Sequence, residues 1–161
     1  MIQVLDNIIQ KNTILKIFKE INSFNFIRGE RDRNDEPHTA TGEVSELPKE
    51  SFTFKTLKKV LSKNKYCNFN KLYRSYVNKF LPNENPYYHT DNDKGGFTIL
   101  YYANPKWILD QQGETQFYLK GEVRGIFPVP GRIVIFSSNI LHRANSFRFD
   151  DRFTIALKFD K

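Results

Sequence analysis

The chain has 161 residues, 39% of them hydrophobic and 27% charged, which fits one soluble globular domain with a single substantial core. Its formal net charge is +7, and its single cysteine excludes an intramolecular disulfide and a multi-cysteine zinc cluster. The sequence has neither a signal-peptide core nor an apolar run long enough to cross a bilayer, so we expect a cytoplasmic protein that does not bind membranes.

The first third of the sequence predicts helices and a loop. Residues 2–20 place apolar side chains near a 3.6-residue period, which predicts an amphipathic helix. Residues 28–49 are charged and aperiodic, which predicts a long surface loop with His38 in solvent. Ser51 is a suitable N-cap for a second helix that ends at Ser62. The core-facing residues of this helix are expected to be Phe52, Leu57, Val60 and Leu61.

From Tyr66 onward the sequence predicts β-strands. Six runs alternate or are rich in β-branched and aromatic residues, and glycines and prolines separate them. These runs are 71–81, 96–104, 113–119, 123–127, 131–138 and 152–159. We therefore predict a mainly β protein with N-terminal helices, a β-sandwich or jelly roll with the helices packed outside. The whole chain is expected to form one domain, in which residues 1–64 support a core formed by residues 65–161.

A basic stretch lies between Ser51 and Leu81, with eight lysines or arginines and no acid. Such a stretch can form a nucleic-acid surface. It can equally be the solvated face of a helix and a strand in a basic protein, and clustered lysine favours this second interpretation.

Two histidines and one aspartate form a candidate metal site. His89 and Asp91 are two residues apart, so on a strand they project from the same face, although such a pair often arises by chance. His142 follows the apolar strand expected near residues 133–136. Two histidines and one carboxylate suit a non-haem Fe(II) oxygenase site with open positions for substrate and oxygen. The same ligands could hold Zn²⁺ with a water, so they leave the metal open.

Arg152 favours the iron alternative. It begins a predicted strand ten residues after His142, and Thr154 lies on the same face of that strand. Beside an Fe(II) site, such an arginine would bind the distal carboxylate of 2-oxoglutarate in a bidentate salt bridge, and Thr154 could add a hydroxyl donor. The alternative for Arg152 is a surface ion pair with Asp150 or Asp151.

The ordered set of motifs across residues 66–160 resembles the Fe(II)- and 2-oxoglutarate-dependent dioxygenases, and the prolyl hydroxylase branch most closely. The matching features are His-x-Asp, a strand ending in Tyr-Tyr-x-Asn, a Gly-Glu-Thr-x-Phe strand, Pro-x-x-Gly-Arg before an apolar strand, the distal histidine, and the arginine ten residues later. This resemblance implies a cupin-like double-stranded β-helix, which is a jelly roll.

The resemblance also implies a role for each site residue. Iron would be bound by His89, Asp91 and His142, and the 2-oxoglutarate tail by Arg152. Tyr102 would help to hold that carboxylate, and Thr115 would line the cofactor site; for both, ordinary sheet packing is the alternative. Asp91 distinguishes the chain from the halogenases of this superfamily, which have a small residue there. The branch often has a pocket tyrosine near Phe80, where this chain has none.

The reaction implied is hydroxylation of an unactivated C–H bond, coupled to conversion of 2-oxoglutarate and O₂ to succinate and CO₂. The substrate implied is a prolyl residue in a peptide or protein, and ascorbate is a candidate cofactor. An AlkB-type nucleic-acid demethylase or a small-molecule hydroxylase of the same superfamily is the alternative. "RFTIALK" lacks the Asn and second Arg that AlkB-type enzymes carry at that place. A non-catalytic jelly-roll module is a third class, but it would need no facial metal site.

Overall fold

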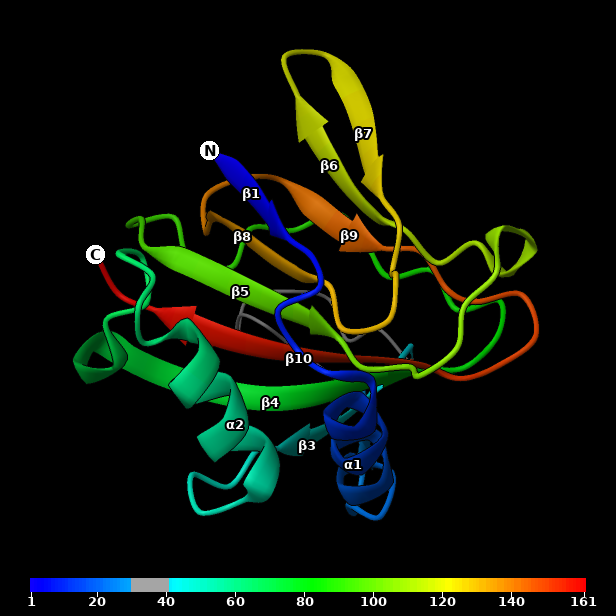
Figure 1. Ribbon diagram of the computed structural model, residues 1–161. Coiled ribbons are helices and arrows are strands. Elements are labelled where there is room, and N and C mark those ends of the chain that lie inside the picture. Colours follow the sequence, from blue (N-terminus) through cyan, green and yellow to red (C-terminus); the bar gives the residue numbers. More distant parts are fainter. Residues whose placement is uncertain (30–40) are drawn as a thin grey trace.

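The computed structural model describes residues 1–29 and 41–161, and shows a mainly β fold with two α-helices (Figure 1). His38 and the middle of the loop predicted at residues 28–49 lie outside the described residues. The α-helices are α1 (Lys11–Ile21) and α2 (Phe52–Leu61). The strands are β1 (Ile2–Leu5), β2 (Ile27–Arg28), β3 (Glu43–Glu46), β4 (Leu72–Phe80), β5 (Phe97–Tyr102), β6 (Thr115–Leu119), β7 (Glu122–Ile126), β8 (Ile133–Ser137), β9 (His142–Ala144) and β10 (Arg152–Phe159). The six strands predicted after Tyr66 are confirmed as β4, β5, β6, β7, β8 and β10.

The strands form two antiparallel sheets. The larger sheet has seven strands in the order β1-β8-β5-β10-β4-β3-β2, and the smaller has three in the order β7-β6-β9. In Figure 1, α1 and α2 lie beneath one face of the larger sheet and the smaller sheet lies above the other. The helices therefore cover one face of the larger sheet and the smaller sheet covers the other. The core between the two sheets is separate from the core on the helix side.

Strand β10 is central and is buried along its whole length. Its residues alternate between the two faces of the sheet. Four of them join the helix-side core: Phe153, Ile155, Leu157 and Phe159. Ala156 belongs to the second core cluster, between the sheets, so Arg152, Thr154 and Lys158 share its face. The strand thus carries apolar residues toward the helices and three polar residues toward the smaller sheet.

The helix predicted at residues 2–20 is only partly correct. Ile2–Leu5 forms strand β1, which pairs with the edge of β8, and the helix begins at Lys11. Asn7 has a φ of 59°, a left-handed conformation that separates the two elements. Four residues are too few for periodicity to distinguish a strand from a helix, and pairing with the open edge of β8 decided the outcome.

The surface loop predicted at residues 28–49 is wrong at its ends. β3 pairs with β4, and β2 pairs with β3, so these residues extend the larger sheet. Glu84, which is 9% exposed, accepts hydrogen bonds from the backbone amides of Gly42 (3.2 Å) and Leu81 (2.7 Å). Backbone pairing with β4 needs no apolar periodicity in the added strand, which is why the sequence pattern did not reveal it.

Helix α2 begins as predicted, with the Ser51 hydroxyl accepting a hydrogen bond from the Phe54 amide at 3.1 Å. Leu57 and Leu61 are buried as expected, but Phe52 is 44% exposed. Thr53 and Phe54 occupy the buried positions instead, because hydrogen bonds to the Glu20 carboxylate of α1 orient the first turn of α2. The Glu20 carboxylate accepts from the amides of Phe52 at 3.0 Å and Thr53 at 2.8 Å.

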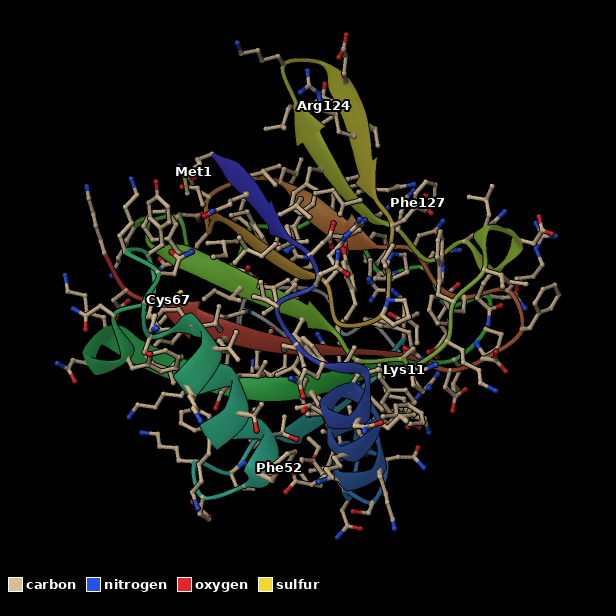
Figure 2. The ribbon with its side chains drawn as sticks, viewed as in Figure 1. Met1, Lys11, Phe52, Cys67, Arg124 and Phe127 are labelled. Carbon is tan, nitrogen blue, oxygen red and sulfur yellow. The ribbon has the colours of Figure 1, made fainter. Side chains whose placement is uncertain are left out.

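Cys67 is buried, whereas the β6–β7 hairpin extends into solvent. Figure 2 labels Cys67 near α2 and Arg124 on the β6–β7 hairpin, which projects away from the rest of the molecule. Burial raises the pKa of the Cys67 thiol to about 11, so the thiol stays protonated and behaves as a small apolar group. No helix in residues 1–29 or 41–161 is long and apolar enough to cross a membrane.

We predict that Glu20→Ala will destabilise the protein although Glu20 lies far from the metal-site candidates in sequence. The substitution leaves the first amides of α2 without their acceptor, so the free energy of unfolding should fall by about 1–2 kcal/mol in urea titrations. Lys16→Ala, an exposed change on the same helix, is the control and should alter stability by less than about 0.5 kcal/mol. Equal effects of the two changes would show that Glu20 does not cap α2.

Candidate metal centre and anion site

The backbone brings the predicted metal ligands together. His89 lies in the segment before β5, and an isolated antiparallel bridge joins it to His142 of β9, with both N–H···O distances at 2.9 Å. The Asp91 amide donates to the Ser138 carbonyl, also at 2.9 Å. One potential ligand atom from each of the three side chains lies within 4.8 Å of the others. The structure therefore gathers His89, Asp91 and His142 into one cluster.

Hydrogen bonds to backbone carbonyls orient both imidazoles. The Nδ1 atom of His89 lies 3.1 Å from the Tyr87 carbonyl, and that of His142 lies 2.9 Å from the Ile140 carbonyl. A carbonyl only accepts, so each Nδ1 is the nitrogen that donates to it, and in the neutral imidazole Nε2 is then the nitrogen with a free lone pair. The two Nε2 atoms lie 3.9 and 3.7 Å from the Asp91 carboxylate oxygens. This tautomer is the one in which histidine binds a metal through Nε2.

Aromatic side chains enclose the His142 ring. Phe117 of β6 stacks on it at 5.8 Å between centroids, and Phe136 of β8 meets it edge-on at 4.6 Å. Both phenylalanines are fully buried. They fix the ring orientation and keep water from that side of the cluster, which strengthens electrostatic interactions inside it.

The Asp91 carboxylate has two further partners, which the sequence interpretation missed. The Thr98 hydroxyl donates to Oδ2, and the Lys158 ammonium lies 2.9 Å from Oδ1. Thr98 and Lys158 are directly opposite each other in the β5–β10 register. The sequence did hold a signal for Lys158: it is the one charged residue inside the apolar run "FTIALKF", and it lies on the same strand face as Arg152.

Arg152 is 1% exposed and lies in a hydrogen-bonded cluster with two other predicted residues. Its Nε donates to the Gly113 carbonyl at 2.9 Å, and its Nη2 to the Thr115 hydroxyl at 3.0 Å. Tyr102 donates to the same Thr115 hydroxyl at 2.7 Å. Thr154 is buried beside them and lies opposite Tyr102 in the register. The structure thus brings Arg152, Tyr102, Thr115 and Thr154 together.

The Arg152 guanidinium has no acidic partner among residues 1–29 and 41–161, so the surface ion pair considered from the sequence is wrong. Asp150 accepts a hydrogen bond from Gln111 at 2.6 Å, and Asp151 pairs with Lys79 at 3.4 Å. Burial lowers the pKa of Arg152, and the nearby Tyr102 and Glu114 oppose that shift. A buried cation without a counter-ion is costly, and an incoming carboxylate would supply that counter-ion.

The Tyr102 hydroxyl remains a donor at neutral pH. Burial raises its pKa, and the nearby Arg152 guanidinium opposes that rise only in part. Tyr102 is 1% exposed and stays uncharged beside Arg152, so the guanidinium keeps its positive charge for an external anion.

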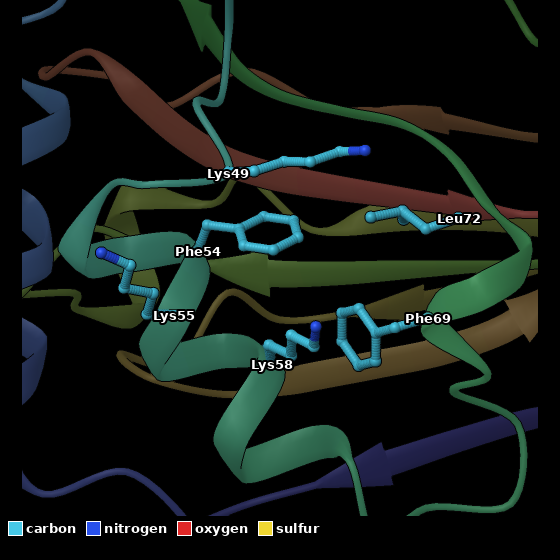
Figure 3. A pocket seen from close by; sticks show the side chains of 6 residues that line it. All are labelled: Lys49, Phe54, Lys55, Lys58, Phe69 and Leu72. Carbon is cyan, nitrogen blue, oxygen red and sulfur yellow. The ribbon is translucent and has the colours of Figure 1, made fainter.

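The basic stretch between residues 51 and 81 is divided in the structure. Arg74 and Lys79 of β4 pair with Glu46 and Glu43 of β3, at 2.9 and 3.1 Å. Lys55 and Lys58 of the stretch, together with Lys49 just before it, line a pocket of about 310 Å³ beside α2 (Figure 3). The lining residues are Lys49, Phe54, Lys55, Lys58, Phe69 and Leu72. Phe54, Phe69 and Leu72 belong to or pack on the helix-side core, whereas the aromatic residues around His142 belong to the core between the sheets.

Comparisons with known proteins bear on the fold. No protein-family model matches the chain, and no curated protein sequence matches it. Several solved structures, however, are similar to it over nearly its whole length. A Trichoplax adhaerens prolyl hydroxylase in complex with a hypoxia inducible factor peptide fragment is 18% identical with a TM-score of 0.74, covering 99% of this chain and 83% of that one.

Two further structures are similar to the same extent. A Pseudomonas putida prolyl-4-hydroxylase is 13% identical, with a TM-score of 0.74 and coverage of 99% and 92% of the two chains. HygX from Streptomyces hygroscopicus, with nickel and 2-oxoglutarate bound, is 12% identical, with a TM-score of 0.74 and coverage of 98% and 82%. The resemblance inferred from the sequence is therefore confirmed at the level of the fold, and this chain has the fold of prolyl hydroxylases and related 2-oxoglutarate–Fe(II) oxygenases.

Proposed function

We propose that this chain is an Fe(II)- and 2-oxoglutarate-dependent dioxygenase that hydroxylates an unactivated C–H bond of a prolyl residue. The observation that carries the proposal is the combination of two features between the same sheets. One is a His-Asp-His cluster with both Nε2 atoms near the carboxylate, and the other is a buried arginine that has no acidic partner within the described ranges, 1–29 and 41–161. If the His-Asp-His cluster or the buried arginine only stabilised the fold, the other would not be needed beside it. A metal and a dicarboxylate cosubstrate require both.

The metal would be held by His89, Asp91 and His142. Two imidazoles and one carboxylate form the facial set that suits non-haem Fe(II). The described residues offer these three His, Cys, Asp or Glu ligands and no larger group, so coordination positions remain for cosubstrate and oxygen. When bound, iron together with 2-oxoglutarate and O₂ supplies the oxidising chemistry, with ascorbate as a candidate reductant. The chain's own part is to hold the imidazoles in one tautomer and to exclude water on the Phe117 side.

The distal carboxylate of 2-oxoglutarate would bind Arg152. The guanidinium uses Nε and Nη2 for Gly113 and Thr115, contacts that orient the planar group. Thr154 would add a hydroxyl donor from β10, and Tyr102 of β5 would add another by turning its single hydroxyl proton from Thr115 to the carboxylate. Thr115 would position Arg152 and Tyr102, since it accepts a hydrogen bond from each of them. A dicarboxylate bound at this site would supply the counter-ion for the buried guanidinium.

The proposed architecture is a double-stranded β-helix that spans residues 1–161 as one catalytic domain. The two antiparallel sheets that face each other, with helices outside the larger one, support this proposal. The site lies between the sheets, where such a fold encloses a ligand.

A prolyl residue in a peptide or protein is the proposed substrate. Two of the similar structures are prolyl hydroxylases, and one of them holds a peptide fragment. The lysine-lined pocket beside α2 lies on the helix side of the larger sheet, so it gives no support to a nucleic-acid substrate at the triad.

We predict that His89→Ala will abolish tight metal binding and 2-oxoglutarate turnover. The loss of one ligand should weaken Co²⁺ or Ni²⁺ binding by at least about a hundredfold, since loss of outer contacts alone costs about 10–100-fold. Calorimetric titration and succinate release measure the two effects. Tyr87→Ala is the matched control, because that side chain is 70% exposed and only its carbonyl contacts His89. Unchanged metal affinity in His89→Ala would refute the metal site.

We predict that Arg152→Met will remove 2-oxoglutarate binding without unfolding the protein. Loss of the charged partner should raise the 2-oxoglutarate Kd of the Ni²⁺-loaded protein by at least about thirtyfold, or about 2 kcal/mol. Urea stability without cosubstrate should stay nearly constant or rise, because replacement of a buried charge by an apolar side chain is often neutral or stabilising. Arg148→Met, an exposed change in the preceding loop, is the charge control. Unaltered 2-oxoglutarate affinity would contradict the assigned role.

The substrate class is tested by O₂-dependent succinate release in the presence of proline-containing peptides, with mass spectrometry of the products. We expect at least one peptide to gain the mass of one oxygen atom, and the same peptide with alanine for proline to gain none. Stimulation by oligonucleotides with methylated bases, and none by peptides, would favour the nucleic-acid demethylase instead. Turnover with free small molecules alone would favour a small-molecule hydroxylase.

A further inference from the structure

The carboxylate of Asp91 is already bound by a cation of the chain itself. Lys158 Nζ lies 2.9 Å from Asp91 Oδ1, and both side chains are 2% exposed. The Thr98 hydroxyl donates to the other oxygen, Oδ2. Each oxygen of the one acidic ligand in the cluster therefore has a protein partner before any metal is considered.

Lys158 has few structural reasons to lie where it does. The rest of the β10 centre is apolar on the helix side and small on the site side, with Ala156 as its neighbour on that face. A buried ammonium is costly unless it is paired, and Asp91 supplies a carboxylate partner at 2.9 Å. The Tyr76 ring, 5.1 Å from Nζ, provides a second favourable contact. Asp91 and Tyr76 thus both stabilise the ammonium at this buried position, and Asp91 is the one that belongs to the metal-site cluster.

The pair changes the charge of the metal site. A facial triad of two neutral imidazoles and one carboxylate carries one negative charge, which attracts a divalent cation. With Lys158 included, the cluster is neutral. An arriving metal must share a carboxylate that is already paired, and it must approach an ammonium that is almost completely buried.

We propose that Lys158 is a built-in counter-ion that holds Asp91 in place in the metal-free protein and competes with the metal for it. This inference rests on the proposed metal site and concerns how that site is loaded. It has two consequences: the metal-free protein stays folded with its acidic ligand positioned, and the metal binds more weakly and exchanges more readily than it would at the bare triad.

An alternative role for Lys158 predicts the opposite sign. If the lysine only orients Asp91 toward the metal, as outer contacts of metal ligands commonly do, its removal weakens metal binding. If it competes, its removal strengthens metal binding. The direction of the change in metal affinity therefore distinguishes the two roles.

The test uses the full chain, stripped of metal with chelator and titrated with Co²⁺ by calorimetry and visible absorption, without 2-oxoglutarate. Lys158→Met should bind Co²⁺ at least about tenfold more tightly than the wild type, or about 1.4 kcal/mol. Its urea midpoint should be lower than that of the wild type without metal, and saturating Co²⁺ should close most of that difference. Lys94→Met is the matched control: it removes an exposed lysine three residues after Asp91 and should leave both quantities within about twofold of wild type or unchanged.

A second variant covers the case in which Lys158→Met does not fold. Lys158→Gln keeps a hydrogen-bond donor for Asp91 but removes the charge, so it should lose less stability and still bind Co²⁺ more tightly. Weaker or equal Co²⁺ binding in the folded lysine variants would overturn the proposal while leaving the metal site intact. Failure of the wild type to bind Co²⁺ in a manner that depends on His89 would instead refute the proposed function.

Discussion

The burial of β10 on both faces is the constraint on which the rest of the structure depends. A central strand without solvent on either side must find partners for every polar group that it carries. On the helix side, four large apolar residues meet that requirement by packing. On the other side, Gly113 and Thr115 present oxygens to Arg152, and Asp91 presents one to Lys158. The core and the candidate site therefore share one strand.

The two buried cations on that strand are satisfied in different ways. Lys158 has an acidic partner, whereas Arg152 is held by a carbonyl and a hydroxyl, which orient it without balancing its charge. One end of the site is thus electrically neutral, and the other retains a positive charge. This asymmetry suits a dicarboxylate whose far end meets the guanidinium, because the anion would bring a negative charge to a cation that has no ion-pair partner in residues 1–29 and 41–161.

The sequence predicted most of the larger sheet because its strands are long and have distinct patterns. β4, β5 and β10 are nine, six and eight residues long and are alternating or rich in β-branched and aromatic residues, and turns separate them clearly. The misses were short elements whose structure depends on a neighbour. β1 and β3 are four residues each, and their pairing with β8 and β4 decided their conformation. Phe52 was misplaced because Glu20, distant in sequence, holds the start of α2.

Residue types and their order along the chain were enough to suggest the two histidines, the aspartate and the arginine, since metal and carboxylate chemistry restrict the possible side chains. Only the tertiary structure could decide the rest: the bridge that joins His89 to His142, the carbonyls that orient their rings, the burial of Arg152 without an ion-pair partner among the described residues, and the ion pair between Asp91 and Lys158. Each of these depends on the register and packing of elements that are far apart in sequence. Local patterns do not contain that register, because it is set by the mutual burial of the two sheets.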